Sequence, residues 1–213
     1  MKFLGNNPFK LYAIHNIVYT EVANIYSDAG EAERAVEADR KLLKICDMLQ
    51  ESYKKKGRIY RDMSTSKYVA LRRMIRNYKA LTPEQIANAN AEVEKLAAIN
   101  PDIRNDIDRQ PRYRAHYYMA TGRYAEAIPM IKAHIADEKA LPNRRQLYDK
   151  LAEAAPNTGD SATLVTALSE YNKNLAELNA ISSSQKYREL QIRYDVDSLT
   201  KDKLALELKA RES

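Results

Sequence analysis

The chain has 213 residues, of which 45% are hydrophobic, and a formal net charge of +6. This length suffices for one solenoid or for one to two globular domains. Only five Gly and seven Pro interrupt a sequence rich in Ala, Leu, Lys and Glu, which favours helices over strands. No stretch approaches the roughly 18 apolar residues of a transmembrane helix, so the composition excludes a membrane span within these residues.

The first two predicted helices span residues 8–29 and 31–56, with Gly30 at the turn between them. Cys46 is the only cysteine and lies among apolar neighbours, so we expect a buried structural thiol without a disulfide. The N-terminus lacks the basic and apolar regions of a signal peptide. Export of the protein would therefore require segments outside this sequence.

The next two predicted helices, 64–80 and 84–99, are separated by a turn at Thr82-Pro83. Positive charge is concentrated around the first of them. Residues 53–79 contain ten basic side chains and one acidic side chain, so this segment carries +9 and the rest of the chain −3. The basicity is therefore a local patch, whose simplest interpretation is a solvated helix face.

Four further helices are predicted by apolar periodicity and by Pro or Gly turn signals. They span residues 103–121, 124–138, 142–157 and 160–179.

An internal repeat relates the predicted helices to one another, and its clearest copy spans residues 112–135. Ala115 and Tyr118 face inward on a first helix, Gly122 breaks that helix, and Ala127 lies on the inner face of a second. Glycine suits the break because it takes a positive φ without a Cβ clash.

Similar spacings recur in three weaker copies, which include Tyr19, Leu71 and Tyr148. The unit resembles the tetratricopeptide repeat, which has about 34 residues in two antiparallel helices. The resemblance covers about residues 8 to 178, although the weaker copies lack the Trp often found early in the first helix. It implies an all-α fold: an α-α superhelix of about four degenerate repeats in residues 1–180. An irregular helical bundle is the alternative.

Residues 181–213 differ in character from the repeats. Ser182-Ser183-Ser184 indicates a cap or a flexible joint, and residues 185–210 contain no Gly or Pro. We expect a long connector helix that packs on the last repeat, pairs with a second copy, or continues into a segment outside this sequence. Its apolar residues Ile192, Val196, Leu199 and Leu206 follow a heptad seam that Lys203 interrupts.

The sequence offers no catalytic constellation. His15, His116 and His134 show no metal-ligand spacing with one another or with Cys46. Phosphate-binding glycine loops, nucleophile elbows and dinucleotide fingerprints are missing from the sequence as well. We therefore expect a protein that is not an enzyme and that holds neither a metal nor a cofactor.

The predicted site is a concave groove. In tetratricopeptide repeats the first helix of each pair lines the concave surface, so the resemblance implies a groove with the basic helix 64–80 near its middle. Guanidinium groups donate paired hydrogen bonds that suit carboxylate or phosphate. The residues predicted to line the groove are Thr20, Asn24, Arg72, Arg76, Lys79, Arg112, His116 and Met119, followed by Asp149 and Glu153.

Such a groove predicts a protein, an acidic peptide or a small anion as partner. Nucleic acid is an alternative because the local charge of +9 would give salt-sensitive phosphate binding. We do not expect nucleic acid as the partner, because no base-reading motif is present.

Degenerate repeats that precede the run Glu189–Asp195 (ELQIRYD) resemble the sensor region of bacterial membrane-bound histidine kinases and related regulators. In those proteins the repeats lie outside the cytoplasmic membrane, and a run of the form ELQ-(K/R)-Y-(D/E) leads through a helical connector to a transmembrane span. The resemblance implies a non-catalytic, periplasmic sensor fragment of a membrane-anchored protein, with a homodimer through the C-terminal helix as one expected form. The alternative is a cytoplasmic scaffold that binds acidic peptides.

Overall fold

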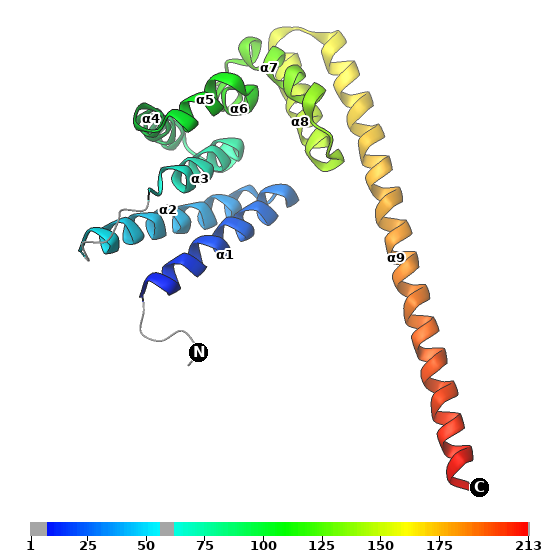
Figure 1. Cartoon of the computed structure of the whole chain (residues 1–213). Coiled ribbons are helices and arrows are strands. Elements are labelled where there is room, and N and C mark those ends of the chain that lie inside the picture. Colours follow the sequence, from blue (N-terminus) through cyan, green and yellow to red (C-terminus); the bar gives the residue numbers. More distant parts are fainter. Residues whose placement is uncertain (1–7, 56–61, 213) are drawn as a thin grey trace.

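The computed structural model describes residues 8–55 and 62–212 (Figure 1). Within these ranges the chain forms nine α-helices and two short 3-10 helices, and no strand. The prediction of an all-α fold is therefore confirmed. No helix in the described part of the chain has the length and apolar character needed to cross a membrane.

The first helix pair consists of α1 (Pro8–Ala29) and α2 (Ala32–Lys55), which pack along one another (Figure 1). Ala23 of α1 and Ala35 of α2 are fully buried, and their small side chains allow the two backbones to approach closely. Residues 56–61, which belong to the predicted basic segment, lie outside the described residues.

The second pair consists of α3 (Ser64–Arg76), which continues into the 3-10 turn η1 (Tyr78–Ala80), and α4 (Pro83–Ile99). A capping box fixes the start of α4. The Thr82 side chain accepts a hydrogen bond from the Gln85 amide, and the Gln85 side chain accepts one from the Thr82 amide. The turn predicted here is confirmed, but the α-helix before it ends four residues earlier than predicted.

The single helix predicted over residues 103–121 is wrong. The chain instead forms α5 (Pro101–Arg109) and α6 (Pro111–Ala120). The break lies at Gln110, whose backbone is extended (φ −110°, ψ 125°). Pro111 causes the break because a proline has no N–H for the helical ladder and disfavours helical φ and ψ in the residue before it.

The last part contains α7 (Tyr124–Asp137), α8 (Leu141–Ala154), the 3-10 turn η2 (Ala155–Thr158) and α9 (Ser161–Glu212). Because α9 runs unbroken through Ser182–Ser184, the cap or joint predicted there is wrong. The predicted domain boundary at residues 180/181 falls inside this helix.

Buried side chains gather in three clusters. The first surrounds Ile75 with residues of α2 to α6, and the second surrounds Ile131 with residues of α6 to α9. The third includes Leu42 and Cys46 of α2, and Cys46 is fully buried, as predicted. Burial raises the pKa of the Cys46 thiol to about 11, so it stays protonated at neutral pH.

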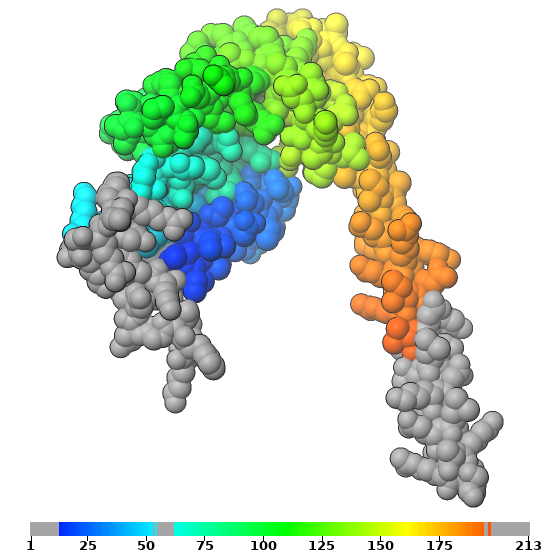
Figure 2. All heavy atoms as spheres, viewed as in Figure 1, coloured from blue at the N-terminus to red at the C-terminus, as the bar shows by residue number. Residues whose placement is uncertain are grey.

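Helices adjacent in sequence pack on one another, and α3 also packs on α6, which joins the first and second halves of the chain. The first part of α9 packs on α8, and beyond it α9 stands clear of the other helices, with open space between it and the α1–α2 pair (Figure 2). The superhelical twist predicted for the repeats stays a prediction. So does the heptad seam, because the side chains of Leu199, Lys203 and Leu206 lie outside those described.

Candidate functional site

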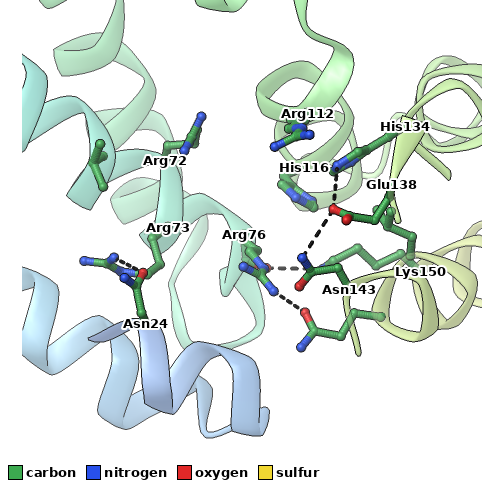
Figure 3. Close-up of a pocket in the computed structure, with 13 residues that line it drawn as sticks. Asn24, Arg72, Arg73, Arg76, Arg112, His116, His134, Glu138, Asn143 and Lys150 are labelled. Atoms are coloured by element: carbon green, nitrogen blue, oxygen red, sulfur yellow. Dashed lines mark hydrogen bonds and ion pairs between the residues drawn. The ribbon is translucent and has the colours of Figure 1, made fainter. Parts of the chain in front are cut away.

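A pocket of about 140 Å³ lies between α3, α6, α7 and α8 and reaches α1 (Figure 3). Cations and imidazoles dominate its lining, with amides and two apolar side chains between them. The lining comprises five cations (Arg72, Arg73, Arg76, Arg112 and Lys150), His116, His134, Glu138, the amides of Asn24, Asn143 and Gln146, and the apolar Val69 and Leu147.

Arg73 points from α3 into the protein and is held by groups of the first helix pair. Its Nε donates to both carboxylate oxygens of Asp39 at 3.0 Å, and its Nη1 donates to Asn24 Oδ1 at 2.6 Å. Both members of this ion pair are buried, with side chains 5% and 0% exposed. Burial raises the pKa of Asp39 to about 6 against the opposing effect of Arg73, so the carboxylate is ionised at neutral pH. The charge of Arg73 is thereby neutralised, and its role is structural.

Arg72 and Arg76 lie one helical turn apart on α3, and each has an acidic partner outside the lining. The Arg72 guanidinium lies 3.2 Å from Asp106, and that of Arg76 lies 3.1 Å from Asp28. Arg76 also donates to the side chain of Gln146 on α8. These contacts fix both guanidinium groups at the wall of the pocket. Other N–H groups of each guanidinium remain as possible hydrogen-bond donors.

Arg112 and Lys150 have no acidic partner within ion-pair distance among the described residues. Arg112 is exposed and forms no hydrogen bond there either. Lys150 Nζ donates to the backbone carbonyl of Arg76 at 3.2 Å and lies 4.8 Å from the centre of the Tyr78 ring. Burial, with the nearby charge of Arg76, lowers the pKa of Lys150 to about 8. The uncompensated positive charge of the pocket therefore lies on these two side chains.

Two histidines face each other across the α6–α7 pair. The rings of His116 and His134 have centroids 6.4 Å apart in an edge-to-face arrangement, and the residues are only 6% and 8% exposed. Nδ1 of His116 and both ring nitrogens of His134 have no hydrogen-bond partner among the described residues. Buried polar atoms are nearly always hydrogen-bonded, so these three nitrogens are exceptions within the described part of the chain, although they are also closed off from the open pocket.

The histidines are neutral at neutral pH. Burial, aided by the charge of Lys150, holds the pKa of His116 well below its usual value. Burial, aided by Arg112, lowers the pKa of His134 to about 4. No group of His, Cys, Asp and Glu within the described residues is arranged to hold a metal ion.

Glu138 is the one carboxylate of the lining. Its Oε1 accepts from the Ala140 amide at 2.9 Å, and its Oε2 accepts from Asn143 at 3.3 Å. The distance from Oε2 to His134 Nε2 is 3.9 Å, too long for a hydrogen bond. The carboxylate is therefore tied to the start of α8 rather than to the imidazole.

The pocket unites five of the ten residues predicted for the groove. Asn24, Arg72, Arg76, Arg112 and His116 all line it, and they come from α1, α3 and α6. These are the first helices of three predicted pairs.

The other five predicted residues lie outside this pocket, and Asp149 and Glu153 line a second pocket. Lys79 forms an ion pair with Glu153 at 2.7 Å beside this second pocket, because α3 ends at Arg76 and the 3-10 turn changes the direction of the residues that follow. Thr20 donates to the carbonyl of Asn16 within its own helix. Met119 is buried in the second core cluster.

Lys150 and His134 are the main lining residues that the sequence did not predict. Lys150 follows the predicted Asp149 by one position, and a shift of one residue rotates a helical side chain by about 100°. His134 lies on the second helix of its pair, which the repeat resemblance does not assign to the groove. Only the pairing of α6 with α7 brings it to His116.

No protein-family model matches the chain, and neither the curated proteins nor the solved structures give a match. Fold and site together define an all-α protein with a basic, histidine-containing pocket between its central helices.

Proposed function

We propose that the protein is a non-catalytic sensor domain that binds an anionic ligand in the pocket between α3, α6, α7 and α8. One observation carries the proposal: cations from three helices line the same small cavity as two buried histidines, three of whose ring nitrogens have no hydrogen-bond partner within the part of the chain that the structure describes. Guanidinium, ammonium and imidazole groups in a partly desolvated pocket form strong, charge-assisted hydrogen bonds with an anion.

The size of the pocket favours a small anion or the anionic end of a larger molecule. Its volume of about 140 Å³ is close to that of a cavity that holds a benzene-sized molecule, about 150 Å³. The carboxylate of an acidic peptide is the second candidate, because it could enter the pocket while the rest of the peptide lies outside.

A ligand in this position would contact the helices that set the direction of α9. Gln146 of α8 accepts from Arg76 of α3 and donates to the carbonyl of Asp28 at the end of α1 at 3.1 Å. Because α8 packs on α9, a shift of α8 against α3 would move the long helix. Such a shift requires the ligand to bind one arrangement more tightly than the other.

The proposed setting follows from the resemblance carried by Glu189–Asp195 and the repeats. It is the periplasmic part of a membrane-anchored bacterial histidine kinase or related regulator, in which α9 connects the pocket to the output. A cytoplasmic scaffold for acidic peptides is the rival. Fractionation of cells that express the native gene product separates the two settings.

Binding is tested by thermal shift and titration calorimetry with phosphate, sulfate, acetate and a hexaglutamate peptide at fixed ionic strength. We expect at least one of these probes to bind the wild-type chain. Arg112→Gln should weaken that binding tenfold or more, because it removes a cation from the pocket lining. The variant should keep the fold, because Arg112 forms no ion pair with any described residue. Charge reversal at Arg72 and Arg76 should abolish the binding.

The matched control is Arg109→Gln, which removes the same charge from the exposed end of α5, outside the pocket lining. Its affinity should equal that of the wild type. Absence of binding by all four probes, or equal loss in Arg109→Gln and Arg112→Gln, would contradict the proposed function.

A further inference from the structure

The hydrogen-bond donors of the pocket approach from several sides. Arg72 and Arg76 come from α3, Arg112 from α6, and Lys150 from α8, while His134 lies on α7 at the far wall (Figure 3). A carboxylate accepts hydrogen bonds mainly in its own plane, whereas a tetrahedral oxoanion presents oxygens in four directions. This distribution of donors fits the tetrahedral ion better.

The two imidazoles supply what the arginines cannot, namely buried polar atoms without a partner. A buried nitrogen that lacks a hydrogen bond is unfavourable, and a ligand oxygen beside it removes this penalty. Among the described residues, Nδ1 of His116 and both ring nitrogens of His134 meet this description. Other atoms of the two residues line the pocket, so the ion reaches these nitrogens when the rings turn toward it.

We infer that the pocket takes a compact tetrahedral oxoanion of the phosphate class, that oxygens of this ion contact His116 and His134, and that the histidine pair takes up a proton when the ion binds. The inference rests on the proposed function and specifies its ligand.

Proton uptake follows from the charges that surround the imidazoles. Burial and nearby cations lower the pKa of both histidines in the free protein. An oxoanion in contact with the rings places negative charge where the cations now dominate, so it raises these pKa values. The charged or titratable groups that act on His116 are Lys150, Arg76, Arg72 and His134, and those that act on His134 are Arg112, Glu138, Arg76 and Asp137.

The expected proton uptake determines how the affinity for the ion depends on pH. His134 has a pKa of about 4 in the free protein and a higher one in the complex, so the complex binds more protons between these two values. Affinity therefore increases as the pH falls through this window. If the anion returns His134 to its ordinary pKa of about 6.5, the affinity rises more than tenfold between pH 7 and pH 5.

Sulfate is the decisive probe because it is tetrahedral and does not itself titrate between pH 5 and pH 7. Calorimetry on the full chain at pH 7, 6 and 5, in buffers of different ionisation enthalpy, gives both affinity and protons exchanged. Lys150, with a pKa of about 8, titrates above this range. Asp39, the partner of Arg73, has a pKa of about 6 and titrates within it, so a variant that lacks only the titration of His134 is required. We expect an affinity that rises at least tenfold toward pH 5, with net proton uptake.

His134→Gln is the matched variant, since glutamine retains a hydrogen-bonding group but does not titrate. It should bind sulfate at pH 7 within a few-fold of the wild type and lose most of the increase toward pH 5. Circular dichroism and urea unfolding at each pH check that the variant is folded. Phosphoserine, compared with inorganic phosphate, tells a phosphomonoester ligand from the free ion.

The outcomes separate the inference from the proposed function. Sulfate binding without proton uptake, or an unchanged pH dependence in His134→Gln, overturns the inference and leaves anion binding in place. Binding of acetate or hexaglutamate but of neither phosphate nor sulfate overturns the ligand class alone. Absence of binding by every probe overturns both.

Discussion

Arg72, Arg73 and Arg76 are identical side chains on one short helix, but their surroundings give them different roles. Arg73 lies in the core with Asp39, whereas Arg72 and Arg76 reach the pocket wall and pair with exposed or half-exposed acids. A buried ion pair contributes little net stability when both charges are present, but loss of one charge leaves the other buried and unpaired.

Asp39→Asn should therefore lower the free energy of unfolding by about 3–5 kcal/mol. The double variant Asp39→Leu/Arg73→Met should recover most of this loss because it leaves no unpaired charge. Urea unfolding at pH 7.5, where Asp39 is ionised, measures both effects.

Glu94→Gln provides the comparison for this prediction. Glu94 pairs with Arg104 at 3.1 Å on the surface, and such pairs contribute about 0–1 kcal/mol. A cost for Asp39→Asn no larger than that of Glu94→Gln would disprove the structural role of the buried pair.

At the scale of elements, three helix ends share one hydrogen-bond pattern built on glycine. After α6, the Gly122 amide donates to Met119 and the Arg123 amide to Tyr118, and Gly122 has a φ of 70°. The same pattern occurs at Gly30 and Gly159. This is the Schellman motif, in which the residue after the helix takes the left-handed conformation.

Gly122→Ala should destabilise the protein by about 1–2 kcal/mol, the cost of a left-handed conformation for a residue with a Cβ. Steric conflict adds little, because the new Cβ would lie 3.9 Å from the ring of Tyr124, an ordinary contact. Gly122→Asn should cost less than Gly122→Ala, since Asn adopts this conformation more readily. Thermal or urea unfolding of the two variants measures the difference, and equal costs would argue against the conformational explanation.

At the scale of the whole molecule, the main unexplained feature is the length of α9. Its 52 residues correspond to about 78 Å, and the described side chains from Ile181 to Arg193 are all exposed. Among them are the apolar Ile181, Tyr187, Leu190 and Ile192. A solvated helix with this many exposed apolar groups is marginal by itself, which favours a second helix as its partner.

The full-length chain should therefore form a dimer at high concentration, while a chain that ends at Ser184 should be a monomer with an unchanged unfolding transition of the helical body. Sedimentation equilibrium of both chains measures this. If both are monomers and the terminal segment shows no helical circular dichroism, the proposed relay through α9 loses its support in this chain.

Most of the helices could be located from the amino-acid sequence. Apolar periodicity and turn residues are local signals, so the starts and ends around Gly30, Thr82 and Gly122 could be predicted to within a few residues. The errors were local too: Pro111 begins a new helix, and Ser182–Ser184 continue one. Asn24, Arg72, Arg76, Arg112 and His116, which were predicted to line a groove, line one pocket.

The burial and charge environment of the pocket residues depend on how the helices pack. The sequence contains His116 and His134, yet only the packing of α6 against α7 brings their rings together and removes them from water. In the same way, only the packing of α2 against α3 places Asp39 opposite Arg73 in the core. The burial and the charge environment of a side chain depend on which side chains of other helices lie opposite it. The local periodicity of a sequence does not identify those side chains.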